Sequence, residues 1–461
     1  MTPTEADARS PTTRLPETAP SPTWRDAVAV YLQRRVLIVM LLGFSSGLPL
    51  ALSGSTLLVW MRESGVDLGT IGLFALVGTP YTLKFLWAPL TDALHVPFFT
   101  QAFGRRRGWL LFSQLLLIAS ILLLALADPA RSPAFVALGA LLVATMSSTQ
   151  DIVVDAFRVE SLPESEQAAG MASYVAAYRI GMLVSTAGAL FLVSAYEGTG
   201  LARSSAWQWG YATMAALVLV GTITALLATE PAQSERAEAA TSGETAFMRV
   251  IHAAWGAFAE FLVRKDAFAA LAFVVLFKFT DAFSGTMTAP FVIDLGFSRN
   301  DYAAIVKGVG LAATLIGGFA GGFVARRYSL AASLWIGGVL QAVANLSFSW
   351  LALVGVNQWA LALAITAENF TSAIGTVIFV AYLSALCRNP LHTATQYALL
   401  TALAAVGRTY LSSVAGYVAK ATGWPLFFAI CVAVAAPSLI LLAWLQRRGH
   451  FAQLDLSGVQ P

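Results

Sequence analysis

Long apolar segments recur along almost the whole chain, and they limit the kind of fold that it can adopt. A helix that crosses the hydrocarbon core of a bilayer needs about 20 predominantly apolar residues. Twelve segments meet this requirement, at residues 36–61, 68–93, 107–127, 133–158, 166–195, 206–228, 268–295, 301–325, 330–354, 357–386, 393–419 and 424–446. Only 11% of the residues are charged, whereas soluble domains contain about 25%. We therefore expect an all-α integral membrane protein with twelve transmembrane helices.

The longest polar interruption divides these segments into two equal sets. It covers residues 229–266 and predicts a linker between a six-helix bundle at 35–228 and a second six-helix bundle at 267–446. Residues 1–34 begin with a stretch rich in Pro and Thr that lacks an apolar core, which predicts a disordered tail. Residues 447–461 form a second short tail, and residues 247–262 are a candidate surface helix within the linker.

The distribution of Lys and Arg predicts the orientation in the membrane, because cytoplasmic connections carry an excess of both residues. With the N-terminus inside, the inner segments collect most of the basic residues, among them Arg25, Arg34, Arg35, Arg105, Arg106, Arg107, Arg249, Arg264, Lys265, Arg326, Arg327, Arg388, Arg447 and Arg448. The outer segments hold Arg62, Arg131, Arg203, Arg299 and Lys420. We expect a multi-pass protein with both termini in the cytoplasm.

The residues that would indicate an enzyme, a metal site or a nucleic-acid-binding protein are missing from the expected positions. The two cysteines are not at metal-ligand spacing, and the four histidines lie near connections or in the tail. Residues 43–47 match the G-x-S-x-G string of serine hydrolases, but they lie in a predicted spanning helix with no histidine at similar depth. We expect no enzymatic activity, no metal, no cofactor and no nucleic-acid partner.

Charged residues inside the predicted spans indicate function, because an ionised group deep in a bilayer costs about 2.5–3.5 kcal/mol on insertion scales. Nine such residues are present: Lys84, Asp151, Asp155, Arg179, Lys278, Asp281, Lys307, Glu368 and Arg408. Lys278 and Asp281 are three residues apart, so their side chains can meet on one helix face. The alternative to a functional cavity is a set of fixed ion pairs that hold the two bundles together.

A polar central cavity for an anionic substrate is the interpretation that we favour. Arg179 and Arg408 occupy corresponding places on the fifth and eleventh helices, and arginine can bind a carboxylate through two parallel hydrogen bonds. Neutral side chains nearby would hydrogen-bond sugar hydroxyls, although any one of them could instead bridge neighbouring helices. The residues expected to bind substrate are Lys84, Gln150, Tyr178, Arg179, Lys278, Glu368, Asn369, Gln396 and Arg408.

Two further roles are expected for the charged residues. Asp151, about 12 Å from the inner end of its helix at roughly 1.5 Å per residue, is the leading candidate for a proton carrier, with Asp281 and Glu368 as alternatives. Near the inner ends of the helices, an acid and an arginine cluster predict a gate. This gate would comprise Asp92, Arg105, Arg106, Arg107, Asp155 and Arg158. The alternative for the arginines is ordinary anchoring at the inner surface.

Several ordered motifs resemble those of the AmpG-type muropeptide permeases of the major facilitator superfamily. They are GFSSGLPL at 43–50, KFLWAPLTD at 84–92, GRRRGW at 104–109, QDIVVDA at 150–156, YRIGMLVS at 178–185 and ATQYALL at 394–400. The similarity continues at Lys278 with Asp281, at Glu368 with Asn369 and at Arg408, and covers roughly residues 36–446. It implies a major facilitator fold, in which two six-helix halves are related by a pseudo-two-fold axis.

The resemblance also implies a function. The family imports N-acetylglucosaminyl-1,6-anhydro-N-acetylmuramic acid, with or without its stem peptide, across the bacterial inner membrane for peptidoglycan recycling. Uptake is expected to be proton-coupled, with protons, the anhydro-muropeptide and the lipid bilayer as the partners of a monomer. The alternatives are a transporter of acetyl-CoA or another organic anion with the same fold, or a membrane sensor or enzyme.

Overall fold

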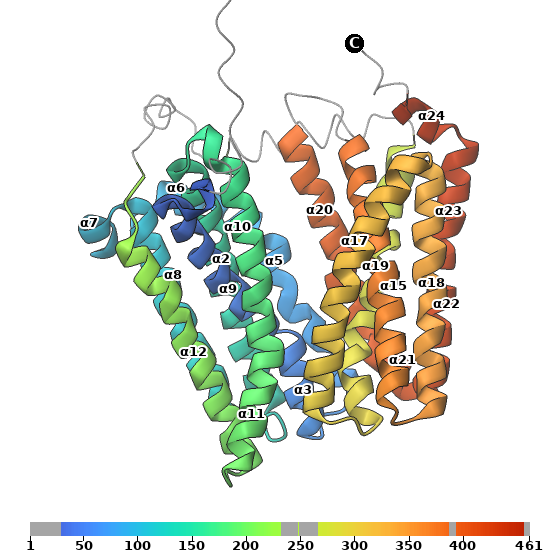
Figure 1. Ribbon diagram of the computed structural model, residues 1–461, viewed down its shortest axis with the longest axis horizontal. Coiled ribbons are helices and arrows are strands. Elements are labelled where there is room, and N and C mark those ends of the chain that lie inside the picture. The colour runs from blue at the N-terminus through green and yellow to red at the C-terminus, as the bar shows by residue number, and fades with distance from the viewer. Residues whose placement is uncertain (1–28, 232–247, 249–265, 387–392, 456–461) are drawn as a thin grey trace, which may run out of the picture.

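The computed structural model describes residues 29–231, 248, 266–386 and 393–455, and every regular element in these ranges is helical (Figure 1). The candidate surface helix at 247–262 lies outside these ranges apart from Met248, as do residues 1–28 of the predicted tail. The helices form two six-helix halves, which we call the N-half and the C-half.

The N-half contains the first six spans. Its elements are α2 (Arg34–Leu52), α3 (Ser55–Glu63), α4 (Leu68–Leu73), η2 (Phe74–Gly78), α5 (Thr79–Leu83), η3 (Lys84–Leu86), α6 (Ala88–Ala93), α7 (Phe99–Phe103), α8 (Arg105–Ala125), α9 (Pro133–Ser161), α10 (Glu164–Leu183), η4 (Val184–Gly188), α11 (Ala189–Gly198) and α12 (Arg203–Leu227). The short η1 (Val30–Leu32) precedes them.

The C-half contains the other six spans. Its elements are α15 (Ala267–Asp294), α16 (Arg299–Asp301), η5 (Tyr302–Val309), α17 (Gly310–Arg327), α18 (Leu330–Val354), α19 (Gln358–Leu386), α20 (Thr393–Tyr410), η6 (Leu411–Val414), α21 (Ala415–Thr422), α22 (Trp424–Val434), α23 (Ala436–Arg447) and α24 (His450–Asp455). Buried aromatic rings pack between its helices; for example, the centroids of Phe291 and Phe428 are 4.7 Å apart.

Two of the twelve spans are not the continuous helices that the apolar runs predict. Ten helices in the described ranges are long and apolar enough to cross a membrane. The span at 68–93 is divided into α4, η2, α5, η3 and α6, and it contains Pro80 and Pro89, which lack a backbone donor. The eleventh span breaks at η6, where the Ser412 and Ser413 hydroxyls donate to backbone carbonyls and so compete with helical hydrogen bonding.

The irregular segments lie where the two halves meet. The π-helical η4 of the fifth span contacts the π-helical η5 of the eighth, and η2 of the second span contacts η6 of the eleventh. The second and eleventh spans approach most closely at Gly72 and Gly416. A Cβ atom on Gly416 would lie 1.8 Å from the Leu68 carbonyl oxygen, so no larger residue fits this crossing.

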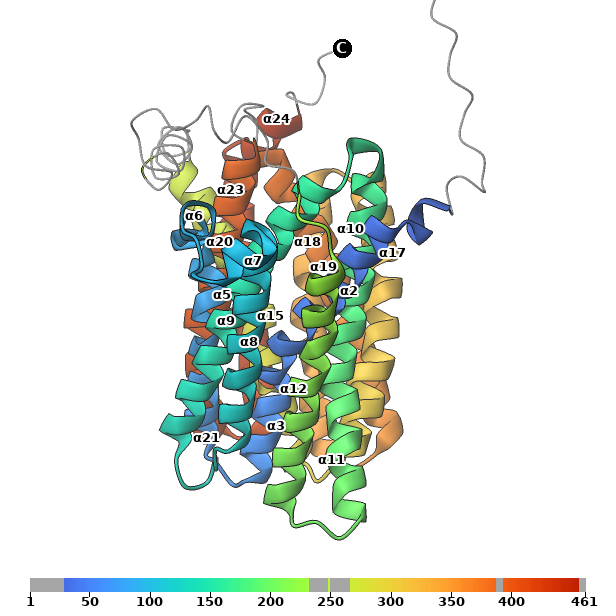
Figure 2. The same cartoon turned by 90° about the vertical axis from the view of Figure 1, so that its left-hand side faces the viewer.

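The halves are joined mainly at one end of the bundle. Figure 1 shows them close together beside α3 and apart toward α24, and Figure 2 shows α11 and α24 at opposite ends, which we call the α11 end and the α24 end. Thr82 and Thr409 link the halves near mid-membrane, with 3.2 Å between hydroxyl oxygens. The other polar links between described residues of the two halves lie toward the α11 end: Arg62–Asp294, Asp67–Lys420, and Arg299 with Glu63, Ser194 and Glu197.

Candidate functional site

Two arginines from opposite halves converge near mid-membrane. Arg179 lies on α10, four residues before the helix ends, and Arg408 lies two residues before the end of α20. Both are exposed, and both guanidinium charges act on the hydroxyl of Tyr178. Neither arginine forms an ion pair with a described carboxylate. The two cations are therefore available to an anionic ligand between the halves.

Lys84 and two tyrosines lie close enough to Asp151 to interact with it electrostatically. Lys84 begins η3, is partly buried and has no ion-pair partner among the described residues. The rings of Tyr174 and Tyr178 are 6.0 Å apart on consecutive turns of α10. Gln396 lies on α20, but its side chain is outside the described part of the structure. Of the residues expected to bind substrate, Lys84, Tyr178, Arg179 and Arg408 thus lie near the boundary between the halves.

Asp151 and Gln150 occupy a buried polar region on α9. Asp151 is 7% exposed, and its Oδ1 atom has no hydrogen-bond partner in the described structure. Gln150 is fully buried; its Nε2 donates to the Ser46 hydroxyl at 3.2 Å, but its Oε1 accepts no hydrogen bond from a described residue. The Tyr81 and Ser147 hydroxyls are buried and unpartnered in the same way. Because each unsatisfied group costs about 1–3 kcal/mol, this region favours water, a proton or a ligand.

Asp281, a candidate proton carrier in the C-half, has a different environment from Asp151. Asp281 on α15 forms an ion pair with Lys278 at 2.8 Å, as their three-residue spacing predicts. Its other oxygen accepts a hydrogen bond from Ser372 at 2.8 Å, and Lys278 also donates to Thr376 at 2.9 Å. Both oxygens of Asp281 are therefore occupied. The pair therefore connects α15 to α19 within the C-half and does not hold the two bundles together.

Glu368 and Asn369 lie on α19 next to that pair. The Asn369 amide donates to Glu368 Oε2 at 2.9 Å, and the Thr314 hydroxyl of α17 donates to Asn369 Oδ1 at 3.2 Å. Glu368 forms no ion pair with a described cation, although the charges of Lys278 and Lys307 act on it. Glu368 remains a candidate for both of the roles expected from the sequence.

We predict that Asp281→Asn lowers the free energy of unfolding by about 1–3 kcal/mol, because Lys278 loses its counter-ion while still partly buried. The double variant Lys278→Met with Asp281→Asn should recover most of this loss, since no unpaired charge remains. Thermal unfolding in detergent measures both effects. Equal melting temperatures for the single and double variants would contradict the prediction.

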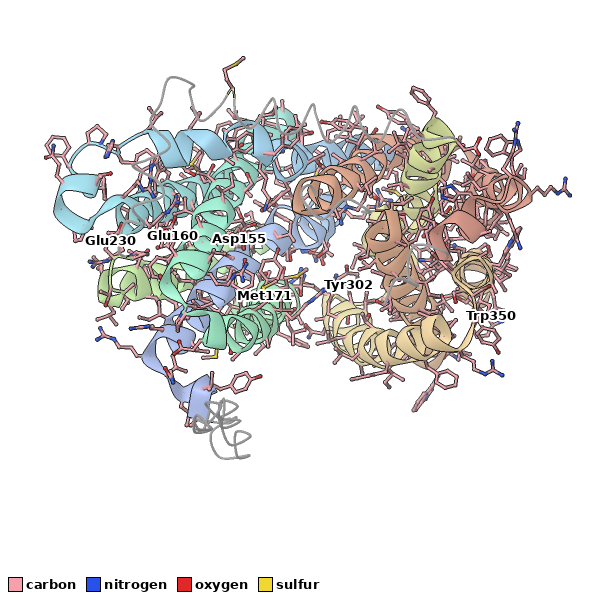
Figure 3. The ribbon with its side chains drawn as sticks, turned by 90° about the horizontal axis from the view of Figure 1, so that it is seen from above. Asp155, Glu160, Met171, Glu230, Tyr302 and Trp350 are labelled. Carbon is pink, nitrogen blue, oxygen red and sulfur yellow. The ribbon has the colours of Figure 1, made fainter. Side chains whose placement is uncertain are left out.

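The residues expected to form a gate near the α24 end contact their own half. Arg106 on α8 forms a bidentate pair with Glu160 on α9, with distances of 2.9 and 2.5 Å. Arg107 donates to the carbonyl oxygens of Ala225 and Leu226 at the end of α12. In Figure 3, Glu160 lies on the N-half beside the labelled Glu230 and Asp155.

The remaining gate candidates complete this arrangement. Arg105 lies 3.8 Å from Glu160, and Asp155 lies 3.6 Å from Arg158. Asp92 lies within α6, but its side chain is outside the described part. These contacts all join residues of the N-half. A gate between the halves at this end remains a prediction. Glu160, which the sequence did not single out, is the acid that Arg105 and Arg106 bind.

The sequence places Arg62 and Arg299 only in the outer segments and does not predict the ion pairs that they form. Arg299, at the start of α16, binds Glu63 and Glu197 of the N-half. Arg62 binds Asp294 of the C-half. An acid–base dipeptide at the end of the first span and an acid at the end of the seventh were the available signals, but their pairing depends on how the halves pack.

Comparison with known proteins identifies the family of this chain. The sequence model of the Major Facilitator Superfamily matches residues 36–408. The chain is 40% identical over 414 residues to the anhydromuropeptide permease of Escherichia coli (strain K12), which covers 90% of this chain and 80% of that protein. It is 34% identical over 419 residues to the putative transporter AmpG 4 of Rickettsia felis, covering 91% and 98% of the two chains.

A solved structure agrees with the fold. The crystal structure of a POT family transporter in complex with a thioalcohol-conjugated peptide matches with a TM-score of 0.66 at 12% identity, covering 90% of this chain and 96% of that one. Identity this low supports the fold alone, whereas the two relatives confirm the resemblance of the sequence motifs. The chain belongs to the Major Facilitator Superfamily and, within it, to the AmpG-type permeases, and is a membrane transporter.

Proposed function

We propose that this protein imports anhydro-muropeptides from the periplasm into the cytoplasm by alternating access, and so supplies peptidoglycan recycling. The observation that carries the proposal is the pair Arg179 and Arg408, which approach from opposite halves, are exposed and have no described counter-ion. These cations would bind the free lactyl carboxylate of the disaccharide, or the carboxylates of the stem peptide when one is attached to the lactyl group. The amides of buried Gln150 and half-buried Asn369 suit the sugar hydroxyls.

The orientation follows from the basic residues at the α24 end. Arg34, Arg105 and Arg447 lie at helix ends there, and cytoplasmic surfaces carry such residues. The α24 end would then face the cytoplasm and the α11 end the periplasm of a bacterial inner membrane. Because the polar links between described residues of the two halves lie mainly toward the α11 end, we assign this arrangement to a state open to the cytoplasm. Residues 35–228 and 267–446 would move as two units joined by 229–266 within a monomer.

Proton coupling is the second part of the proposal, and Asp151 is its leading carrier. A carrier must exchange its proton and change partners during the cycle. Asp151 has an oxygen free of described partners, whereas both oxygens of Asp281 are held by Lys278 and Ser372. Lys84 acts electrostatically on Asp151, so a substrate anion that binds Lys84 would alter the affinity of Asp151 for a proton.

Reconstituted protein tests the proposal directly. We expect liposomes containing it to take up labelled N-acetylglucosaminyl-1,6-anhydro-N-acetylmuramic acid, faster when the outside is more acidic than the inside. Liposomes without protein are the control, and unlabelled disaccharide should compete. Uptake of labelled acetyl-CoA but not of the disaccharide would overturn the proposal in favour of an organic-anion transporter of the same fold.

A further inference from the structure

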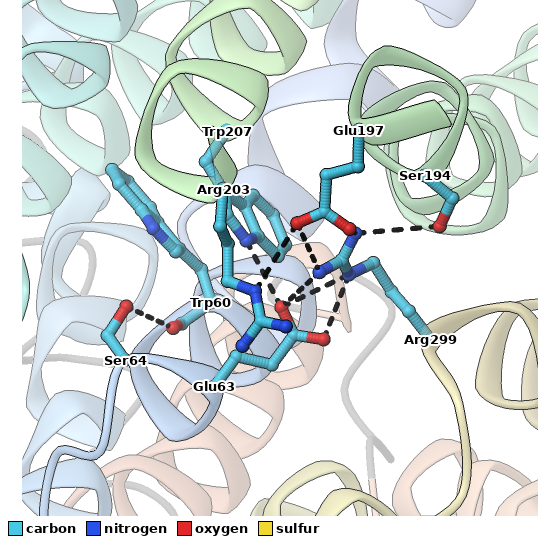
Figure 4. A network of polar contacts seen from close by, with 8 residues as sticks. All are labelled: Trp60, Glu63, Ser64, Ser194, Glu197, Arg203, Trp207 and Arg299. Atoms are coloured by element: carbon cyan, nitrogen blue, oxygen red, sulfur yellow. Dashed lines mark hydrogen bonds and ion pairs between the residues drawn. The ribbon is translucent and has the colours of Figure 1, made fainter. Parts of the chain in front are cut away.

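Arg299 forms a buried junction between the halves at the α11 end (Figure 4). Its Nε and Nη2 atoms donate to the Glu63 carboxylate at 2.9 and 2.7 Å. Its Nη1 atom donates to Glu197 at 3.0 Å, and its guanidinium lies 5.3 Å from the Trp207 ring centroid. The Arg299 side chain is only 6% exposed. One residue of the C-half thus binds the ends of two different spans of the N-half, α3 and α11.

The N-half holds this junction in a fixed geometry. The Trp207 indole donates to Glu63 Oε2 at 3.1 Å, and its ring stacks on Trp60 with 5.6 Å between centroids. Glu197 also forms an ion pair with Arg203 at 3.3 Å, which lies within the N-half. The two carboxylates are therefore positioned before Arg299 arrives, and Arg299 supplies the bonds that cross between the halves.

A second ion pair between the halves lies beside the first, and here the cation belongs to the N-half and the anion to the C-half. Arg62, the residue before Glu63, forms an ion pair with Asp294 at the end of α15. The Trp424 indole donates to the same Asp294 at 3.2 Å. The end of the first span therefore offers one cation and one anion, and the connection after the seventh span offers the matching anion and cation. This complementarity favours a single register between the halves.

A third, exposed pair completes the contact. Lys420 on α21 lies 3.6 Å from Asp67, and both side chains are largely exposed. The Thr70 hydroxyl, which donates to Asp67, holds the pKa of this carboxyl below its usual range. Water screens such a pair, so it contributes little to closure. The buried junction at Arg299 is the stronger candidate for control.

We propose that Arg299, Glu63 and Glu197 form an outer latch that must open before substrate can enter from the periplasm. The inference rests on the proposed transport function, because a latch has a role only if the two ends of the bundle open alternately. Closing the latch brings α4 and α21 together at the crossing of Gly72 and Gly416. Releasing Arg299 removes bonds to both N-half helices at once and allows this crossing to separate.

A cysteine at the crossing reports the state of the latch without any substrate. Ser413 is 7% exposed, and its backbone carbonyl lies beside Gly72 of the other half. We would place Ser413→Cys in a background with Cys387→Ala and Cys431→Ala. Protein in sealed right-side-out vesicles is treated from outside with a membrane-impermeant maleimide, and the labelling rate is measured. In the otherwise intact protein this rate should be low.

Arg299→Ala should raise the labelling rate at least about tenfold, because the outer end opens more often. Arg203→Ala is the matched control: it removes a cation bound to the same Glu197, but no bond between the halves. Its labelling rate should stay at the starting value. Arg299→Lys, which keeps the charge and loses the planar fork, should give an intermediate rate. A similar rate for Arg299→Ala and Arg203→Ala would overturn the latch.

The second link supplies a test that does not depend on Arg299. Arg62→Asp should also raise the rate, and combining it with Asp294→Arg should lower it again by restoring an opposite-charge pair. If Arg299→Ala lowers thermal stability without changing labelling, the residue is a static brace and the proposal is wrong. Labelling needs no muropeptide, so failure of the latch is distinguishable from failure of the transport function, which only the uptake assay can show.

Discussion

Replacing Arg408 by alanine should lower muropeptide uptake about 30- to 150-fold. Its exposed guanidinium, near mid-membrane and without a described counter-ion, is suited to a substrate carboxylate. A bidentate, charge-assisted pair contributes about 2–3 kcal/mol, and each 1.4 kcal/mol corresponds to a factor of ten. Initial uptake rates into proteoliposomes at substrate concentrations below saturation measure the loss.

Two controls separate substrate binding from a general effect on the fold. Arg408→Lys keeps the charge without the fork and should retain part of the uptake. A disaccharide whose lactyl carboxylate is converted to an amide should be transported poorly by the starting protein, and Arg408→Ala should reduce its uptake much less. Equal losses for the acid and the amide would show that Arg408 does not bind the carboxylate. Arg179→Ala provides the same comparison from the N-half.

Replacing Asp151 by asparagine should abolish accumulation while leaving exchange. With one proton per substrate, a pH difference of one unit supplies about 1.4 kcal/mol and can concentrate substrate about tenfold. An amide cannot carry the proton, so the ratio of internal to external substrate should fall to about one. Counterflow, in which labelled substrate exchanges for unlabelled substrate inside, should persist because it needs no net proton movement.

Asp155→Asn is the matched control for this experiment, since Asp155 lies one helical turn from Asp151 and is about half exposed beside Arg158. It should keep the pH-driven accumulation. If Asp151→Asn still concentrates substrate tenfold, Asp151 is not the carrier. Glu368→Gln would then be the next variant, because Glu368 forms no ion pair with a described cation.

Local spacing in the sequence predicted a pairing that a single helix controls. The Lys278–Asp281 pair follows from a three-residue separation on α15. The Asp155–Arg158 contact has the same separation on α9, but the sequence assigned these two residues only to the expected gate. The apolar runs predicted the number of spans and the all-helical class. They did not predict the division of the second and eleventh spans, because hydrophobicity reports burial in lipid and not the hydrogen-bond pattern within a span.

The difference between Asp151 and Asp281 was not available from the sequence. Both are acids within apolar helices, and the sequence did not rank them firmly as proton carriers. The structure separates them, since Ser372 reaches Asp281 from α19, whereas Asp151 retains a buried oxygen without a described partner. The distinction depends on which neighbouring helix supplies a hydroxyl.

The sequence by itself determined an all-helical membrane fold of twelve spans, its family and the depth of its intramembrane charges, because these depend on residue type and local spacing. Only the tertiary structure decided which charges meet across the two halves. Arg299 and Glu63 are 236 positions apart and bind only because α16 and α3 come together at the α11 end. Their contact depends on the packing of two bodies that the alternating-access proposal expects to move, and no periodicity along the chain encodes that packing.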